Sequence, residues 1–149
     1  RRGFDKEDFA RNHPGGELGK QLALKVENIM HPINDVAQIN NKDSISSCAK
    51  KMTDNPLGAA LLLENGSLKG IVTEGDLRKS IASNLDLSNS IEPFINDNPI
   101  SIHSSVSILD AMKIMEDRSS KISCLPVVDS DGKCLGLLTI HDLYQTKLV

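Results

Sequence analysis

Gly70-Ile71-Val72-Thr73-Glu74-Gly75-Asp76-Leu77 returns 66 positions later as Gly136-Leu137-Leu138-Thr139-Ile140-His141-Asp142-Leu143. Both stretches read Gly, two apolar residues, Thr, two variable residues, Asp and Leu. An internal repeat decides the architecture before any single residue is weighed. A spacing of 66 residues exceeds the units of common solenoid proteins, so the repeat predicts two small domains.

An amphipathic helix is duplicated together with this motif. Apolar residues recur at i, i+3, i+4 and i+7 in two places 63 positions apart, as Ile45, Cys48, Ala49 and Met52 and as Ile108, Ala111, Met112 and Met115. This spacing predicts one buried helical face in each copy. The change of spacing from 63 to 66 predicts a three-residue insertion between helix and motif, in the longer stretch 116–124 of the second copy, because loops absorb insertions.

Short apolar runs fill the rest of each copy and predict strands. They lie at 36–39, 59–63 and 68–72 in the first copy and at 99–102, 125–128 and 134–138 in the second. Turn residues at 64–66 and 130–132 predict hairpins, and a further helix is expected to begin after each motif. The sequence therefore predicts an α/β (α+β) fold of two β-α-β-β-α units, over residues 25–84 and 85–149.

Composition indicates an ordinary globular protein of 149 residues with a net charge of −3, 39% hydrophobic and 25% charged residues. A unit of roughly 60 residues buries only about 60% of its unfolded surface and is marginally stable alone. We therefore expect the copies to pack as an intimate pseudo-twofold pair. A homodimer or higher homo-oligomer is expected for the same reason.

Several function classes are disfavoured. The chain has no Trp, one Tyr and a mildly acidic charge balance, which argues against nucleic-acid binding. It has no apolar run near the roughly 20 residues that span a bilayer and no secretory signal at its start, so we expect a cytoplasmic protein without membrane contact. Three cysteines and four scattered histidines match no metal-site spacing.

The repeated motif places a hydroxyl and a carboxylate where a strand ends and a helix begins. Free backbone N–H groups and the positive end of the helix dipole favour an anion such as phosphate there. The Asp could accept hydrogen bonds from ribose hydroxyls, and the preceding Gly could let the backbone approach a ligand. The candidate nucleotide-binding residues are therefore Gly70, Thr73, Asp76, Gly136, Thr139 and Asp142.

A purely structural interpretation exists for the same residues. Thr-x-x-Asp is close to a capping box, in which the Thr caps the helix and the acid bonds back to the N–H of the Thr. Capping alone does not require a Gly three residues before each Thr, and the presence of that Gly in both copies favours binding.

The repeat resembles a tandem pair of CBS domains, small modules that pair and hold adenosine-type nucleotides in clefts between them. By that resemblance Thr73, Asp76, Thr139 and Asp142 would contact ligand phosphate and ribose, and the backbone near Pro99 and Pro126 would border the base. His141 is expected to help neutralise the phosphate together with Arg78 or Lys147 from nearby helices. No cofactor is expected to be required, and no metal.

The start of the chain narrows the resemblance. Several short segments are similar to the D-arabinose 5-phosphate isomerase family. They are Asp8-Phe9-Ala10, His13-Pro14-Gly15-Gly16, Leu18-Gly19, Lys25-Val26, Ile29-Met30-His31 and the later Thr73-Glu74-Gly75-Asp76-Leu77-Arg78-Lys79. In that family a sugar isomerase (SIS) domain precedes a CBS pair. The enzymes interconvert D-ribulose 5-phosphate and D-arabinose 5-phosphate for Kdo, a sugar of lipopolysaccharide or capsule. Residues 1–24 would then be the end of the SIS domain and a linker. The chain would be the C-terminal part of such an isomerase.

This resemblance implies regulation rather than catalysis by the chain itself. His13 resembles a histidine of the isomerase site, but the rest of that site is absent from the sequence. The expected function is a nucleotide-sensing CBS pair that acts on its own SIS domain, with AMP, ATP or CMP-Kdo as candidate ligands. The alternative is a ligand-free structural or dimerisation module.

Overall fold

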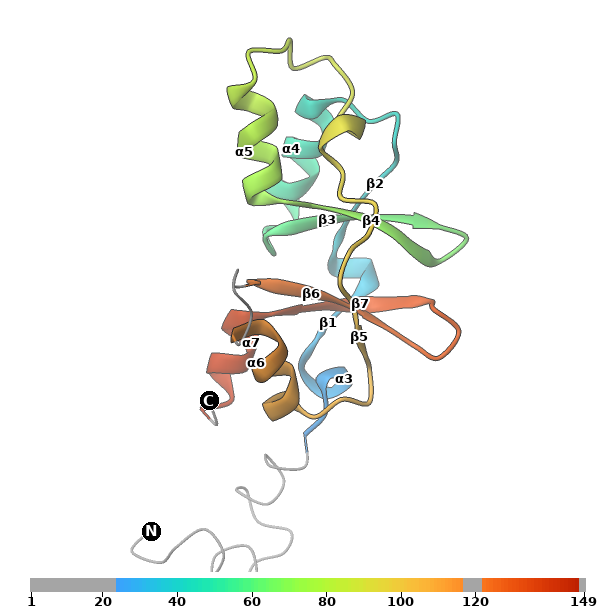
Figure 1. Cartoon of the computed structure of the whole chain (residues 1–149), viewed down its shortest axis with the longest axis vertical. Coiled ribbons are helices and arrows are strands. Elements are labelled where there is room, and N and C mark those ends of the chain that lie inside the picture. The colour runs from blue at the N-terminus through green and yellow to red at the C-terminus, as the bar shows by residue number, and fades with distance from the viewer. Residues whose placement is uncertain (1–23, 117–121, 148–149) are drawn as a thin grey trace, which may run out of the picture.

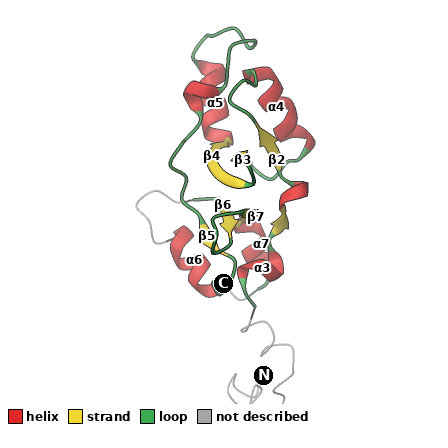
Figure 2. Cartoon of the chain, turned by 90° about the vertical axis from the view of Figure 1, so that its right-hand side faces the viewer, coloured by secondary structure: helices red, strands yellow, loops and turns green. Residues whose placement is uncertain are grey.

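Two small sheets face each other at the centre of the molecule, and helices cover the outer side of each (Figure 1). The computed structural model describes residues 24–116 and 122–147. A view turned by 90° shows the same order of layers, with helices towards both ends and strands between them (Figure 2). None of the helices in this part of the chain has the length and apolar content needed to span a bilayer.

The first sheet has the order β2-β3-β4 and belongs to the first repeat. Its strands are β2 (Ala37–Ile39), β3 (Ala59–Glu64) and β4 (Ser67–Thr73), and its helices are α4 (Ile45–Asp54) and α5 (Glu74–Ala82). The pair β2 and β3 is parallel, and β3 and β4 form an antiparallel hairpin. Asn65 and Gly66 have φ of 52° and 83° in its turn, the left-handed conformation that Asn and Gly tolerate best.

The second sheet has the order β1-β7-β6-β5. Its strands are β1 (His31–Pro32), β5 (Ile102–His103), β6 (Cys124–Val128) and β7 (Cys134–Thr139), with the helices α3 (Val26–Ile29), α6 (Ile108–Glu116) and α7 (Ile140–Gln145). Two 3-10 turns, η1 (Ile33–Asp35) and η2 (Glu92–Phe94), complete the described elements. The predicted β-α-β-β-α order is therefore confirmed in both copies.

The helix periodicity predicts the buried faces well. Ile45, Cys48 and Met52 of α4 are buried, as are Ile108, Ala111 and Met115 of α6. The extended segment predicted at 99–102 is shorter than expected, because β5 pairs with β6 only through Ile102 and His103. Most of the longer stretch of the second copy, residues 117–121, lies outside the described residues.

Equivalent residues meet between the repeats, as pseudo-twofold packing requires. Ser67 and Lys133, which are 66 positions apart, form an antiparallel bridge, and Cys134 N–H donates to the carbonyl of Gly66 at 2.9 Å. Both sheets contribute to one buried cluster of Val36, Ala59, Leu61, Ile71, Cys124, Cys134 and Leu137. The two copies therefore share a core, which we call the central core.

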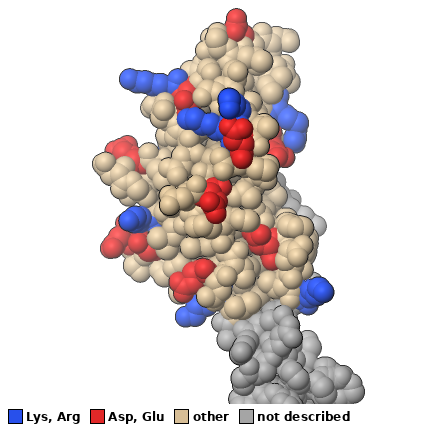
Figure 3. Space-filling view, turned by 180° about the vertical axis from the view of Figure 1, so that it is seen from behind, with Lys and Arg blue, Asp and Glu red and all other residues tan. Residues whose placement is uncertain are grey.

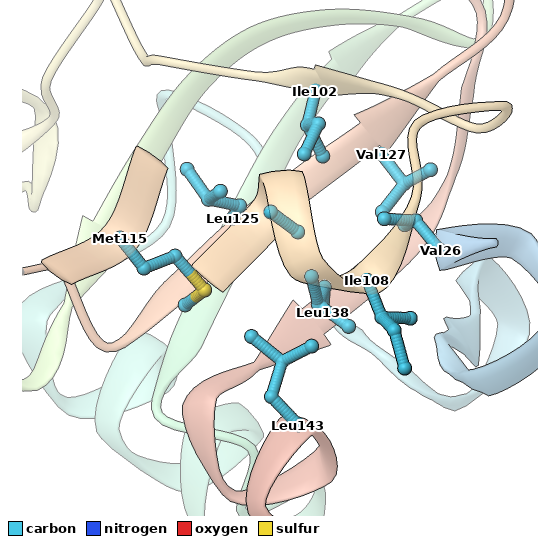
Figure 4. Packing of buried hydrophobic residues seen from close by; sticks show 9 residues of the cluster. Val26, Ile102, Ile108, Met115, Leu125, Val127, Leu138 and Leu143 are labelled. Atoms are coloured by element: carbon cyan, nitrogen blue, oxygen red, sulfur yellow. The ribbon is translucent and has the colours of Figure 1, made fainter. Parts of the chain in front are cut away.

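Each repeat also lends its leading segment to the other. We call residues 24–32 the first strap and residues 89–96 the second strap. Val26 of the first strap is buried among Ile108, Val127 and other second-repeat residues (Figure 4). Ile91 of the second strap is buried with Ile45 and its neighbours in the first repeat.

The hydrogen bonds of the two straps are equivalent. Val26 N–H donates to the carbonyl of Val106 at 2.8 Å, and Ile91 N–H donates to the carbonyl of Asp43 at 2.9 Å. Further along, β1 pairs with β7 of the second repeat, and Asn96 exchanges two backbone hydrogen bonds with Ile71 of the first. The predicted boundary between residues 84 and 85 divides the sequence repeats, but the packing crosses it.

The three cysteines are free and buried. Burial raises the pKa of Cys48, helped by the charge of Asp43, and burial raises that of Cys124, each to about 11. At pH 8 only about a thousandth of such a thiol is ionised, and the thiolate is the reactive form.

We therefore expect negligible labelling of the native chain by a disulfide reagent at pH 8 over minutes, followed by rapid reaction of all three thiols in 6 M guanidinium. The measurement is the absorbance of the released thiolate. One thiol that reacts at once in the native chain would contradict the burial of these cysteines.

Candidate functional site

Both repeated motifs form complete capping boxes. Thr73 Oγ1 accepts from Asp76 N–H at 3.3 Å, and Asp76 Oδ2 accepts from Thr73 N–H at 3.0 Å. The same bonds at Thr139 and Asp142 measure 3.1 and 3.0 Å. The capping interpretation is therefore correct for the free chain. Because each box uses one carboxylate oxygen, capping leaves the other oxygen able to bind elsewhere.

Each motif opens on a cleft whose far wall comes from the other repeat. The Thr73 cleft has a volume of about 310 Å³ and is lined by Gly58, Thr73, Glu74, Gly75, Arg78, Ile122, Ser123 and Cys124. The Thr139 cleft has about 290 Å³ and is lined by His31, Pro56, Leu57, Thr139, His141 and Asp142. These volumes lie near the lower end of the range for small-molecule sites.

The two acids of the motifs differ in position. Asp142 lines the Thr139 cleft directly. Asp76 does not line the Thr73 cleft, and reaches it through Thr73, whose N–H and hydroxyl both bond to its Oδ2 at 3.0 Å. Loss of Asp76 would therefore act on the cleft chiefly by releasing Thr73.

A smaller chamber of about 160 Å³ adjoins the Thr73 cleft, with Thr73, Ile122 and Cys124 in the walls of both. Its other walls are Ile71, Asn96, Ile100 and Leu125, so it is mostly apolar with one amide. Two of these residues are direct neighbours of Pro99 and Pro126, where we expect the base. A polar cleft joined to an apolar chamber suits a ligand with a charged end and a flat hydrophobic end.

The expected cation and imidazole lie in different clefts. Arg78 lines the Thr73 cleft. His141 lines the Thr139 cleft, where its Nε2 lies 3.2 Å from the side-chain nitrogen of Gln145. The structure therefore does not bring Arg78 and His141 to one phosphate, which corrects the expectation that they act together.

The two motif glycines make room for protein rather than for ligand. A Cβ on Gly70 would lie 2.6 Å from Ile95 Cγ2 of the second strap, and a Cβ on Gly136 would overlap the carbonyl of His31 in the first strap. The side of the backbone that we expected a ligand to approach is thus covered by a strap. This corrects the role predicted for Gly70 and Gly136.

The residues that form the far walls of the clefts were not predicted from the motif. His31 is the clearest case, since its Nε2 lies 3.0 Å from Asp142 Oδ1 although 111 positions separate the residues. A second repeat, in which Val26 to His31 matches Ile91 to Asn96 at a spacing of 65, could have indicated the strap positions. Pro56, Leu57, Ile122 and Ser123 lie in loops without such a pattern, and His13 lies outside the described residues.

A further hollow of about 390 Å³ lies between α4 and α5 and shares Glu74 and Arg78 with the Thr73 cleft, but it is mostly apolar and, among the described residues, has no second-repeat wall. On the face shown in Figure 3, acidic and basic side chains are interspersed and neither kind gathers into a patch. Within residues 24–116 and 122–147, no group of three or more His, Cys, Asp or Glu side chains is placed to hold a metal ion. The two clefts are therefore the features that we consider further.

Comparisons with known proteins identify the repeat. The CBS domain model matches residues 26–83 and 91–147. The arabinose 5-phosphate isomerase KdsD of Pseudomonas aeruginosa is 40% identical over 146 residues, which are 97% of this chain and 44% of that protein. KdsD of Francisella tularensis is 37% identical, over 97% of this chain and 44% of that protein. The chain thus spans less than half the length of these curated relatives. A CBS domain protein of Pyrobaculum aerophilum, solved with AMP, superimposes with a TM-score of 0.67 at 22% identity, covering 80% of this chain and 89% of that one.

Proposed function

Since this chain belongs to the CBS domain family, we propose that it is a regulatory module that senses a phosphorylated nucleoside in the clefts between its repeats. The observation that carries the proposal is that each duplicated helix cap opens on a cleft walled by the other repeat. A ligand held there contacts both repeats and favours one arrangement of them. Regulation follows when the attached catalytic domain responds to that arrangement.

Two classes of ligand suit this proposal. AMP or ATP is suggested by the Pyrobaculum aerophilum neighbour, whose structure holds AMP. CMP-Kdo, an activated end product, is suggested by feedback on the pathway of the isomerase relatives. The apolar chamber beside Asn96 would take the base, and the amide of Asn96 could bond to its edge.

We propose further that the catalytic partner is an SIS domain of the same protein, in keeping with the isomerase relatives. The whole protein would interconvert D-ribulose 5-phosphate and D-arabinose 5-phosphate in the cytoplasm, for lipopolysaccharide or capsule. It would act as a homodimer or larger homo-oligomer. The chain itself would bind and signal without catalysing the reaction.

The rival function is a structural module that holds no ligand. The complete capping boxes favour it, because Thr73 and Thr139 are already satisfied in the free chain. A thermal-shift panel of AMP, ATP, CMP and CMP-Kdo separates the two functions. Ligand at 100 times its dissociation constant adds about 2.7 kcal/mol, which raises the melting temperature by about 5 to 10 °C. No shift with any of the four would favour the structural module.

Variants of the two acids test where a ligand binds. We expect Asp76→Ala to weaken nucleotide binding in the Thr73 cleft by about tenfold, because it releases Thr73 from the two bonds to Asp76 Oδ2. Asp142 lines its own cleft, so Asp142→Ala should weaken by a similar factor any binding that occurs in the Thr139 cleft. Isothermal titration calorimetry measures the affinity, and urea unfolding measures the stability.

Ser44→Ala is the matched control for these variants. Ser44 caps α4 by accepting from Ser47 N–H at 2.9 Å, and it lines neither cleft. Its loss should lower stability by about 1 kcal/mol and leave the affinity unchanged. If the Asp variants behave like Ser44→Ala, the acids are caps only.

A further inference from the structure

The two clefts occupy equivalent places in the two repeats but differ in the side chains that face them. A shift of 66 residues relates Thr73 to Thr139 and Arg78 to Tyr144. The cleft volumes, about 310 and 290 Å³, are nearly equal, so size does not distinguish the clefts. Their charged and polar groups do.

Arg78 gives the Thr73 cleft a guanidinium group at the first turn of α5. One terminal nitrogen lies 3.8 Å from where a Cβ of Gly75 would stand, so the side chain folds back over that turn. The ion pairs between described residues do not include Arg78. Glu74 is the carboxylate that lines the same cleft. A guanidinium beside helix N–H groups can hold a phosphate through two parallel hydrogen bonds.

The Thr139 cleft has no such group, since neither Lys nor Arg is among its lining residues. Tyr144 stands at the position equivalent to Arg78 and donates its hydroxyl to Glu116 Oε1 at 2.9 Å. The helix that begins there, α7, has six residues, whereas α5 has nine. A phosphate would therefore find weaker attraction in the Thr139 cleft.

A residue of the first strap, His31, also bonds to the carboxylate of Asp142 in the Thr139 cleft. Asp142 Oδ1 bonds to His31 Nε2 at 3.0 Å while its Oδ2 accepts from Thr139 N–H, so both carboxylate oxygens are engaged. At the other motif the position equivalent to His31 is Asn96, which lines the adjoining chamber. The Asp76 carboxylate bonds only to Thr73, through Oδ2. Within the described residues, Asp76 Oδ1 therefore remains available.

We infer that the clefts are unequal: the Thr73 cleft takes the phosphate of one nucleotide per chain through Arg78, and His31 keeps the Thr139 cleft without a ligand by binding the Asp142 oxygen that a ribose hydroxyl would need. This inference rests on the proposed function and adds to it the site and the number of ligands. The ligand class is a nucleoside 5′-phosphate, with its phosphate at Arg78 and its base in the chamber beside Asn96.

Isothermal titration calorimetry of the 149-residue chain with AMP, ATP, CMP and CMP-Kdo tests the inference. The probe that binds should do so with one molecule per chain. Arg78→Ala should weaken binding by about 10- to 100-fold, and Arg78→Lys should restore part of the loss. Lys79→Ala is the matched control, because it removes the next cation of α5 without changing a lining residue, and it should stay within about twofold of wild type.

The converse experiment opens the second cleft. His31→Asn combined with Tyr144→Arg copies Asn96 and Arg78 into the Thr139 cleft, and two molecules per chain are expected when the circular dichroism shows a folded protein. An unchanged count of one would overturn the role given to His31. Two molecules on the wild type, or an Arg78→Ala variant that binds as the wild type does, would overturn the inequality while leaving the proposed function intact. If none of the four probes binds at 1 mM, the proposed function fails, and the inference fails with it.

Discussion

Replacing Gly136 with alanine should lower the free energy of unfolding by about 3 kcal/mol, the upper part of the range for overpacking a rigid site. The added Cβ would overlap the backbone carbonyl of His31, which cannot rotate away as a side chain would. Relief requires the first strap to separate from β7, with loss of the pairing of His31 and Pro32. Urea unfolding followed by circular dichroism measures the effect.

Gly75→Ala is the matched control. Gly75 lies in the first turn of α5, and its added Cβ would meet nothing closer than 3.7 Å. Alanine favours a helix over glycine by up to about 1 kcal/mol, so this variant should be as stable as the wild type or more stable. A loss below about 1 kcal/mol for Gly136→Ala would show that the strap can move aside easily.

Leu137→Ala should lower the free energy of unfolding by about 3 to 4 kcal/mol, within the range for a fully buried leucine. Leu137 has no exposed surface and contributes to the central core from the second repeat. Because residues of both repeats line the cavity that it would leave, the first repeat should be destabilised with the second. Amide hydrogen exchange should therefore speed up at Leu61 in β3 as well as at Leu138 in β7.

Leu85→Ala provides the comparison for this variant, since 44% of Leu85 is exposed. It should change the stability by less than about 0.5 kcal/mol. If Leu137→Ala accelerates exchange in the second repeat while β3 keeps its protection, the two repeats unfold separately and do not share a cooperative core.

The helices and strands were predictable because they depend on local periodicity. The apolar spacing of Ile45, Cys48 and Met52 predicts a buried helical face, and the structure buries all three. Duplication strengthens the prediction, because the same pattern recurs at Ile108. Some predicted elements end elsewhere, as at β5, where ladder length depends on a partner strand. The short β1, η1 and η2 were not predicted.

The exchange of straps was not predictable, since it is a choice between two equivalent docking surfaces. Val26 and Ile91 are apolar residues that either repeat could bury, and no local pattern favours one repeat over the other. The role of the motif glycines was misjudged for the same reason. A glycine indicates that something approaches closely, but the sequence does not say whether that neighbour is a ligand or a distant part of the chain.

One wall of each cleft was predictable from the sequence, and the opposite wall was not. The Thr and Asp of each motif belong to one short segment, and the structure places Thr73, Thr139 and Asp142 at the clefts. Their opposite walls, such as Ser123 and Leu57, come from irregular loops of the other repeat, and pairwise packing at that distance leaves no period in the sequence.

Exchange of the straps has a consequence for how such a protein could be divided. A gene cut between the repeats would give a first half that carries Val26 without the second-repeat residues that bury it. The second half would carry Ile91 without the first-repeat residues that bury it. Neither half could bury its own leading residues as they are buried in the intact chain. The two halves are complementary, however, because each carries the segment that the other buries. Two separately made polypeptides should therefore associate into the intact fold when mixed, although neither should fold alone.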